Sequence, residues 1–184
     1  MISFAFRRNR QDPSIAALYG AIVAQARAPA FYRDHGVSDT VSARIDMIML
    51  HLVLVLRRLR QISGAKSALG QALFDRFCVD MDDNFREMGV GDLKVPEEMH
   101  RIAGAFYGRA RAYDAALDAA DPAALSAVVA RNVFGAVEPA LGATRLAAYM
   151  MEAMTLLEQQ SEAALRRGEL TFPDAAAGAP PLGG

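Results

Sequence analysis

The sequence predicts an all-α fold: a single domain of about six helices over residues 1–171, followed by a flexible tail at 172–184. Three observations support this prediction. Apolar residues recur three and four positions apart along most of the chain, as they do on one face of a helix. Asp-Pro pairs occur where helices should start, because aspartate caps a helix and proline suits its first turn. No stretch alternates apolar and polar residues between hairpin turns, as a sheet would require.

The composition indicates one folded domain rather than a disordered chain. A chain of 184 residues is long enough to bury about two-thirds of its unfolded surface. Hydrophobic residues make up 53 % of the sequence, far from the weakly hydrophobic, highly charged compositions that stay disordered. We therefore expect the domain to fold alone.

The first two helices lie on either side of an aromatic connection. Asp12-Pro13 caps and opens the first helix, which should end near residue 27, before Pro29. The connection, residues 31–40, reads FYRDHGVSDT, and its last two residues both suit the cap of the next helix. That second helix should reach about Ile62. Because it is apolar on nearly every side, we expect it at the centre of the fold.

The third helix is expected to begin at Ala65 or Ser67 and to run to about Met88. Gly89 stands where a left-handed residue would end it. In that arrangement Val90 folds back on the last turn in a Schellman motif.

Three more helices complete the domain. Pro96 starts the fourth, because the two glutamates that follow it suit the positive end of the helix dipole. Asp121-Pro122 opens the fifth, and Glu138-Pro139 leads into the sixth, which Gly168 should end. From Phe172 onward the chain is rich in Pro, Gly and Ala without apolar periodicity, as is typical of a mobile tail.

No membrane span and no secretory signal are expected. The most apolar run, residues 47–56, would cover about 15 Å as a helix, against a hydrocarbon layer of about 30 Å. The N-terminal stretch MISFAFRRNR lacks the long apolar region of a secretory signal. The run at 47–56 therefore predicts a buried helix.

Charge and cysteine content limit the possible partners and compartments. The formal net charge is −1, so the chain has no general field for DNA. The only cysteine, Cys78, excludes an internal disulfide, fits a reducing compartment and is expected to be a buried, inert thiol. These features favour a cytoplasmic location, with peripheral attachment to the inner membrane as an open alternative.

An acidic stretch, DMDDNFREMGVG at residues 80–91, is the main candidate for ion chemistry. It does not fit a calcium loop, because Phe85 stands where the loop needs glycine and Gly91 where it needs glutamate. On a helix, Asp80 and Asp83 lie on the face opposite the apolar side chains. We therefore expect a solvated acidic face rather than a metal site.

Other polar residues have structural explanations as well. Arg57, Arg58 and Arg60 come near the end of a helix, where cations complement its dipole, although ribosomal RNA or an anionic membrane surface stays open as a partner. His51 lies inside the apolar run and is expected to be a hydrogen-bonded core residue. Gly108, in mid-helix, costs about 1 kcal/mol relative to alanine unless another backbone packs closely there.

Three segments together resemble the ubiquinol-cytochrome c chaperone family: FYRDHGVSDTVSARIDMIMLHLVLVLRRL, LFDRFCVDMDDNFREMGVGDLKV and AFYGRARAYDAAL. The resemblance covers about residues 30–135. It implies a helical, non-enzymatic assembly factor for the respiratory cytochrome bc1 complex, with no cofactor and no obligate small molecule. It further implies that the client is newly made cytochrome b or another apolar subunit of that complex.

We expect the motif residues of the family to form a client-docking surface. In this hypothesis the connection at 31–40, the helix end at 86–92 and the FYGR segment converge into a groove with exposed aromatic side chains. The residues expected to contact the client are Phe31, Tyr32, Asp39, Asp80, Asp82, Arg86, Glu87, Val90, Asp92, Tyr107 and Arg109.

Two other functions stay open. An all-helical, magnesium-dependent enzyme would use Asp80, Asp82 and Asp83 to bind a diphosphate substrate, and would need those carboxylates to face a cavity opposite a second acidic motif. A generic helical adaptor would bind an unrelated partner.

Overall fold

The computed structural model describes residues 12–64, 67–138 and 140–177. These residues form eight α-helices and no strand: α2 (Pro13–Ala26), α3 (Pro29–Arg33), α4 (Val41–Ser63), α5 (Ala68–Glu87), α6 (Val95–Asp118), α7 (Pro122–Val133), α8 (Leu141–Gln159) and α9 (Glu162–Arg166). Six of them have at least 12 residues, and α3 and α9 have five each. The predicted all-α class with about six principal helices is confirmed.

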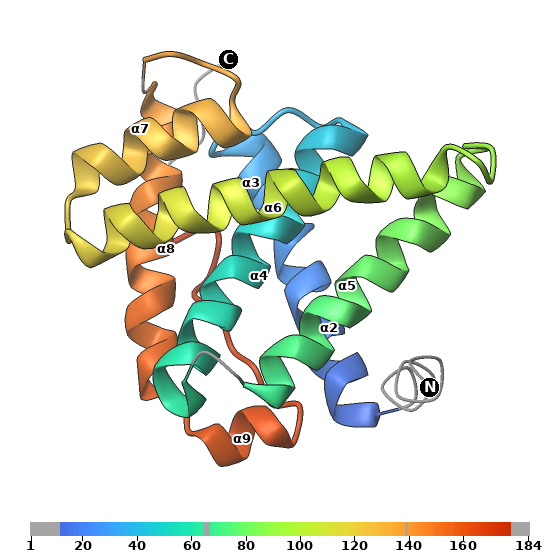
Figure 1. Cartoon of the computed structure of the whole chain (residues 1–184). Helices are drawn as coiled ribbons and strands as arrows, with labels where there is room; N and C mark the ends of the chain where they lie inside the picture. Colours follow the sequence, from blue (N-terminus) through green and yellow to red (C-terminus); the bar gives the residue numbers. More distant parts are fainter. Residues whose placement is uncertain (1–11, 65–66, 139, 178–184) are drawn as a thin grey trace.

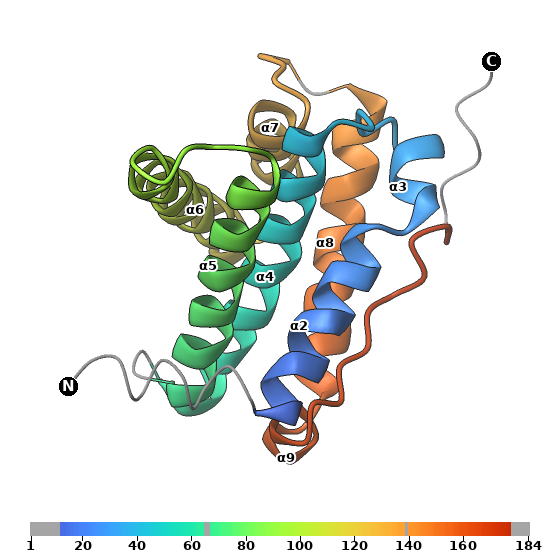
Figure 2. The same ribbon diagram turned by 90° about the vertical axis from the view of Figure 1, so that its right-hand side faces the viewer.

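Helix α4 is the centre of the fold, as its composition predicts. It contacts α2, α5, α6, α7 and α8, and Figures 1 and 2 show it enclosed by these helices. Every residue from 47 to 56 is buried. The apolar run is thus a core helix, and within the described residues no helix is long and apolar enough to cross a membrane.

The helix ends follow the local signals in the sequence. The Asp12 carboxylate accepts a hydrogen bond from the Ser14 amide at 2.9 Å, and the Asp121 carboxylate caps α7 in the same way. The Ser67 hydroxyl accepts from the Gly70 amide at the start of α5. At the end of α5, Gly89 has φ +81° and the amide of the next residue, Val90, donates to the Phe85 carbonyl at 3.0 Å. This is the predicted Schellman motif.

Two connections differ from the prediction. Pro29 starts the short helix α3, because proline suits a first helical turn as well as it ends a preceding one. The predicted sixth helix is two helices, since Gln160 has extended backbone angles and Ser161 caps α9. Gly168, with φ +83°, therefore lies after α9 rather than α8. Pro139, expected to lead into this region, lies outside the described residues.

The first part of the expected tail packs against the helices. Phe172 is half-buried, whereas Pro173 and Ala175 are buried. In Figure 2 this segment runs from α9 past α2 toward α3. Residues 178–184 lie outside the described residues. The N-terminal residues 1–11, for which no secretory signal is expected, also lie outside them.

The arginines at the end of α4 join helices as well as complementing the dipole. Arg57 pairs with Asp114 and Asp118 on α6, at 3.2 and 2.6 Å. Arg60 also pairs with Asp114, at 2.6 Å. Arg58 donates to the carbonyl oxygens of Glu158 and Gln160 at the end of α8. The basic cluster thus fixes α6 and α8 on α4.

Candidate functional site

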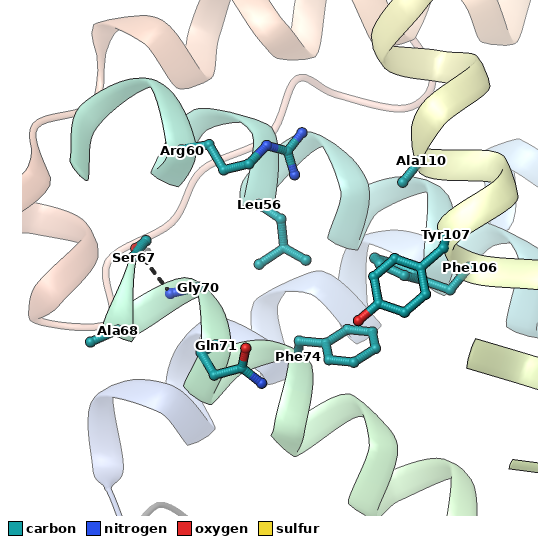
Figure 3. A pocket seen from close by; sticks show the side chains of 10 residues that line it. All are labelled: Leu56, Arg60, Ser67, Ala68, Gly70, Gln71, Phe74, Phe106, Tyr107 and Ala110. Carbon is teal, nitrogen blue, oxygen red and sulfur yellow. Dashed lines mark hydrogen bonds between the residues drawn. The ribbon is translucent and has the colours of Figure 1, made fainter. Parts of the chain in front are cut away.

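A groove of about 460 Å³ opens between the C-terminal half of α4, the first half of α5 and the middle of α6 (Figure 3). It is the candidate functional site. Its lining residues are Leu56, Arg60, Ser67, Ala68, Gly70, Gln71, Phe74, Phe106, Tyr107 and Ala110.

Aromatic rings form one wall of the groove. The Phe74 ring lies 4.9 Å from that of Phe106 and 5.6 Å from that of Tyr107, measured between centroids. Phe106 is 3 % exposed and belongs to the core, whereas Tyr107 is 61 % exposed. Adjacent residues on a helix point about 100° apart, so α6 buries one ring and presents the next one at the groove.

The polar side chains of the groove are largely engaged within the protein. Arg60 pairs with Asp114, Gln71 donates to Asp75 at 2.7 Å, and Ser67 caps α5. Because these polar groups already have partners within the protein, the groove favours apolar contacts over chemistry on a substrate.

Two glycines lie one turn apart on the exposed side of α6, next to Tyr107. A Cβ atom added to Gly104 or to Gly108 would meet nothing within 4 Å. The close backbone contact considered for Gly108 is therefore absent from the described fold. A mid-helix glycine is still unfavourable by about 1 kcal/mol relative to alanine, so the fold itself does not explain it.

The end of α5 carries a second group of predicted site residues. Arg86 donates to Asp82 at 2.7 Å and pairs also with Asp92. These ion pairs brace the loop to α6, in which Met88 is 51 % and Leu93 is 97 % exposed. Glu87, also predicted for the site, is exposed on the last turn of α5, while Val90 is half-buried against the core.

Asp80 departs from the expected solvated face. Its carboxylate accepts a hydrogen bond at 2.8 Å from the Tyr19 hydroxyl on α2, and its side chain is half-buried. Burial, together with this carboxylate, raises the pKa of Tyr19. The expectation that the acids all face outward is thus wrong at Asp80, because α2 packs along that side of α5.

The carboxylates do not form the arrangement that a magnesium enzyme requires. Asp80 bonds to Tyr19, Asp82 pairs with Arg86, and Asp83 is exposed. None of the three lines the groove. Across the described residues, no group of three or more His, Cys, Asp or Glu side chains is placed to hold a metal ion.

The predicted residues of the 31–40 connection have different environments. Phe31 is 0 % exposed, with its ring 4.9 Å from that of Tyr149, so it is a core residue and not part of a surface. The Tyr32 hydroxyl donates to the Ala26 carbonyl at 2.8 Å. Arg44 covers the Tyr32 ring and also pairs with Asp39 at 2.7 Å.

Arg109, unlike Tyr107, points into the protein. Its guanidinium pairs with Asp46 on α4 at 2.8 Å and donates to the Asn132 carbonyl on α7 at 3.4 Å. Only 20 % of its side chain is exposed. It is therefore not on an exposed helix face, because α4 places a carboxylate opposite it.

The three predicted segments do not share the groove. Tyr107 lines the groove. In the 31–40 connection, Tyr32 bonds to α2, Asp39 pairs with α4 and the Asp34 carbonyl accepts from α8, while the cluster at 86–92 pairs within itself. Sequence analysis missed Leu56 and Phe74 as groove residues. Both belong to apolar helical faces that sequence alone assigns to the core.

His51 has its expected structural role, whereas Cys78 is half-buried rather than buried. The His51 ring is 0 % exposed and hydrogen-bonded to Met47 and Tyr149. Burial lowers its pKa to about 4. Burial and, to a smaller extent, Asp75 raise the pKa of the Cys78 thiol to about 11, which keeps it protonated and unreactive near neutral pH.

Comparisons with known proteins extend the resemblance seen in the sequence. No curated protein matches the chain. The crystal structure of the Cbp3 homolog from Brucella abortus is similar, with a TM-score of 0.82 and 38 % sequence identity, over 96 % of this chain and 99 % of that one. Residues 33–172 match the family model described as ubiquinol-cytochrome C chaperone, beyond the expected limit near residue 135. The chain therefore belongs to the ubiquinol-cytochrome c chaperone family.

Proposed function

We propose that this protein is a non-enzymatic assembly chaperone of the cytochrome bc1 complex, and that it binds newly made cytochrome b or another apolar subunit of that complex. Membership of the chaperone family supports the assembly role. The apolar groove supports a client of that chemistry. We also place its work at the cytoplasmic surface of the inner membrane, where such a client is inserted, with the ribosome as a second possible contact.

One observation carries the choice of surface: the exposed ring of Tyr107 stands at the mouth of the groove beside Gly108, above which there is open space. Helix-binding grooves hold apolar side chains of a partner helix, and a residue without a side chain lets the partner backbone approach closely. A docked client helix would thus explain a glycine that the fold does not need.

The cluster of Asp82, Arg86 and Asp92 is the second part of the proposed surface. Its ion pairs hold a loop that exposes Met88 and Leu93. Flexible methionine side chains adapt to varied apolar partners. Among the other predicted residues, Tyr32, Asp39, Glu87 and Val90 stay candidates for contact at the edges, whereas Phe31 and Arg109 act in this proposal by holding the helices in place.

The test is co-purification of cytochrome b from membranes with tagged variants of the full chain. Gly108→Leu adds bulk to the exposed face, and Gly108→Ala is its matched control, since both substitutions favour the helix. We expect Gly108→Leu and Tyr107→Ala to lower cytochrome b recovery severalfold, and Gly108→Ala to retain it. Arg131→Ala, exposed on α7, controls for unrelated surface changes.

Equal recovery with all of these variants would contradict the groove as the client site. In that case Arg86→Glu tests the end of α5 separately. The generic adaptor is tested by deleting the gene: selective loss of the assembled bc1 complex supports the chaperone, and unchanged bc1 levels support an unrelated partner.

A further inference from the structure

The segment after α9, residues 169–177, lies along the helices as a strap, with no helix or strand over 169–174 and a turn at 175–177 (Figure 2). Gly168 turns the chain into it with φ +83°, and a Cβ atom there would lie 2.8 Å from Ala17 on α2. The strap therefore starts at a close contact with α2.

Side chains of the helical body bind the main chain of the strap at every second residue. The side-chain amide of Gln160 binds both backbone groups of Thr171. Its Nε2 donates to the Thr171 carbonyl at 2.8 Å, and its Oε1 accepts from the Thr171 N–H at 2.9 Å. Further along, Gln25 donates to the Pro173 carbonyl at 2.9 Å, and His35 Nε2 lies 2.8 Å from the Ala175 carbonyl. Between Thr171 and Pro173 this spacing of two is that of an extended peptide, whereas Ala175 begins a turn in which the Ala177 N–H donates to the Asp174 carbonyl at 3.1 Å.

Four side chains of the strap pack on the helical body: Leu170 and Phe172 are half-buried, and Pro173 and Ala175 are buried. The Phe172 and His51 rings are nearly perpendicular, with centroids 5.2 Å apart, and Ala175 is 4 % exposed. Thr171 and Asp174 are exposed. The site thus selects apolar residues at these four positions, among them one aromatic residue and a small residue three positions later, while its hydrogen bonds reach groups that every peptide has.

The floor of the site is a connected polar network. Gln25 Nε2, which binds the strap, also donates to the Tyr149 hydroxyl at 3.0 Å, and that hydroxyl lies 3.0 Å from His51 Nε2. These side chains come from α2, α8 and α4, so three helices fix the donor of the site in place.

The strap does not use every polar group of the site. His35 is 2 % exposed, and its Nδ1 has no hydrogen-bond partner among the described residues. When Nε2 donates to the Ala175 carbonyl, Nδ1 is an acceptor without a donor. An occupant that donates a hydrogen bond to His35 Nδ1 would satisfy one more buried polar atom than the strap does.

We propose that this site binds an extended segment of a partner protein, with an aromatic residue and a small residue three positions after it, and that the strap is its internal, displaceable occupant. Main-chain recognition makes the exchange possible, as it does in other grooves that bind extended peptides. The covalently attached strap has a high effective concentration. An identical strap from a second copy would therefore lose to it, which favours a foreign segment that fits better.

The test uses the full chain and a fluorescent peptide with the sequence of residues 168–177. In the Phe172→Ala chain the internal strap is weakened, so we expect the peptide to bind at least about tenfold more tightly than to the wild-type chain. A peptide with alanine in place of its phenylalanine should not bind. Thr171→Ala, which changes an exposed side chain and keeps the backbone, should behave as wild type.

Lack of tighter binding by a folded Phe172→Ala chain would overturn the proposal. Hydrogen exchange of the wild-type chain gives an independent result. The Thr171 amide should exchange faster than the buried amides of α4, and equal rates would mean that the strap leaves only when the whole domain unfolds. A concentration-dependent dimer that exchanges straps would assign the site to a second copy and overturn the choice of a foreign segment.

Discussion

His51 Nε2 lies 3.0 Å from the Tyr149 hydroxyl, so α4 and α8 meet through a hydrogen bond inside the core. His51 Nδ1 lies 2.8 Å from the Met47 carbonyl, which can only accept. Nδ1 therefore carries the proton, and Nε2 accepts from Tyr149. Because Gln25 donates to the same hydroxyl, the chain of donors and acceptors is complete with a neutral imidazole.

Removing the hydroxyl in Tyr149→Phe should destabilise the domain. The substitution leaves His51 Nε2 without its donor and one N–H of Gln25 without its acceptor. Buried groups left unpaired cost about 1–3 kcal/mol, and urea unfolding followed by circular dichroism measures the loss. Tyr107→Phe, on an exposed ring, is the control and should change stability by less than about 0.5 kcal/mol. Similar effects of the two substitutions would show that the buried hydrogen bonds contribute little.

Stability should fall in acid through His51. Its pKa is about 4 in the folded protein, below the ordinary value of 6.5, so the unfolded chain binds the proton first. The free energy of unfolding should thus decrease as the pH falls from about 6.5 to about 4, by about 3 kcal/mol in total. Unfolding of the wild type and of His51→Gln across this range measures the effect. Parallel pH curves for the two proteins would rule out this residue as the cause.

Gly142→Ala should be more harmful than a typical surface change. A Cβ atom at this position would clash with the His35 carbonyl oxygen and would lie 3.1 Å from the Phe134 ring. Overpacking of this kind costs about 1–3 kcal/mol. Gly104→Ala, where the space is open, is the matched control and should stabilise α6 by up to about 1 kcal/mol. Thermal unfolding of both variants distinguishes the two glycines, and a stable Gly142→Ala protein would contradict the close contact.

Sequence predicted the features of this fold that depend on local interactions. The Asp12 cap and the Schellman motif at Gly89 involve residues within one turn of each other, so spacing alone specifies them. The burial of α4 follows from its nearly continuous apolar surface.

The environments of neighbouring motif residues were not predictable in this way. Tyr107 and Arg109 belong to one short motif, yet one is at the surface and the other meets Asp46 inside the protein. A helix turns by about 100° per residue, and only the packing of other helices decides which direction is inward. The same holds for the strap, whose composition resembles a free tail but whose carbonyl groups meet Gln25 and His35.

Breaking the ion pair of Arg109 with Asp46 from one side should destabilise the domain, because both side chains are largely buried. Breaking a buried pair from one side leaves an uncompensated charge and costs about 3–5 kcal/mol. Because 20 % of the Arg109 side chain stays exposed, we expect a smaller loss of about 2–3 kcal/mol for Asp46→Ala. The double variant Asp46→Ala, Arg109→Met removes both charges and keeps the aliphatic packing, so it should be more stable than Asp46→Ala alone. Asp82→Ala, which breaks a more exposed pair on α5, should change the free energy of unfolding by less than about 1 kcal/mol. A double-mutant cycle with Asp46→Ala, Arg109→Met and the double variant, followed by urea unfolding, gives the coupling energy between the two side chains. Strict additivity of the two substitutions would mean that these side chains do not stabilise each other.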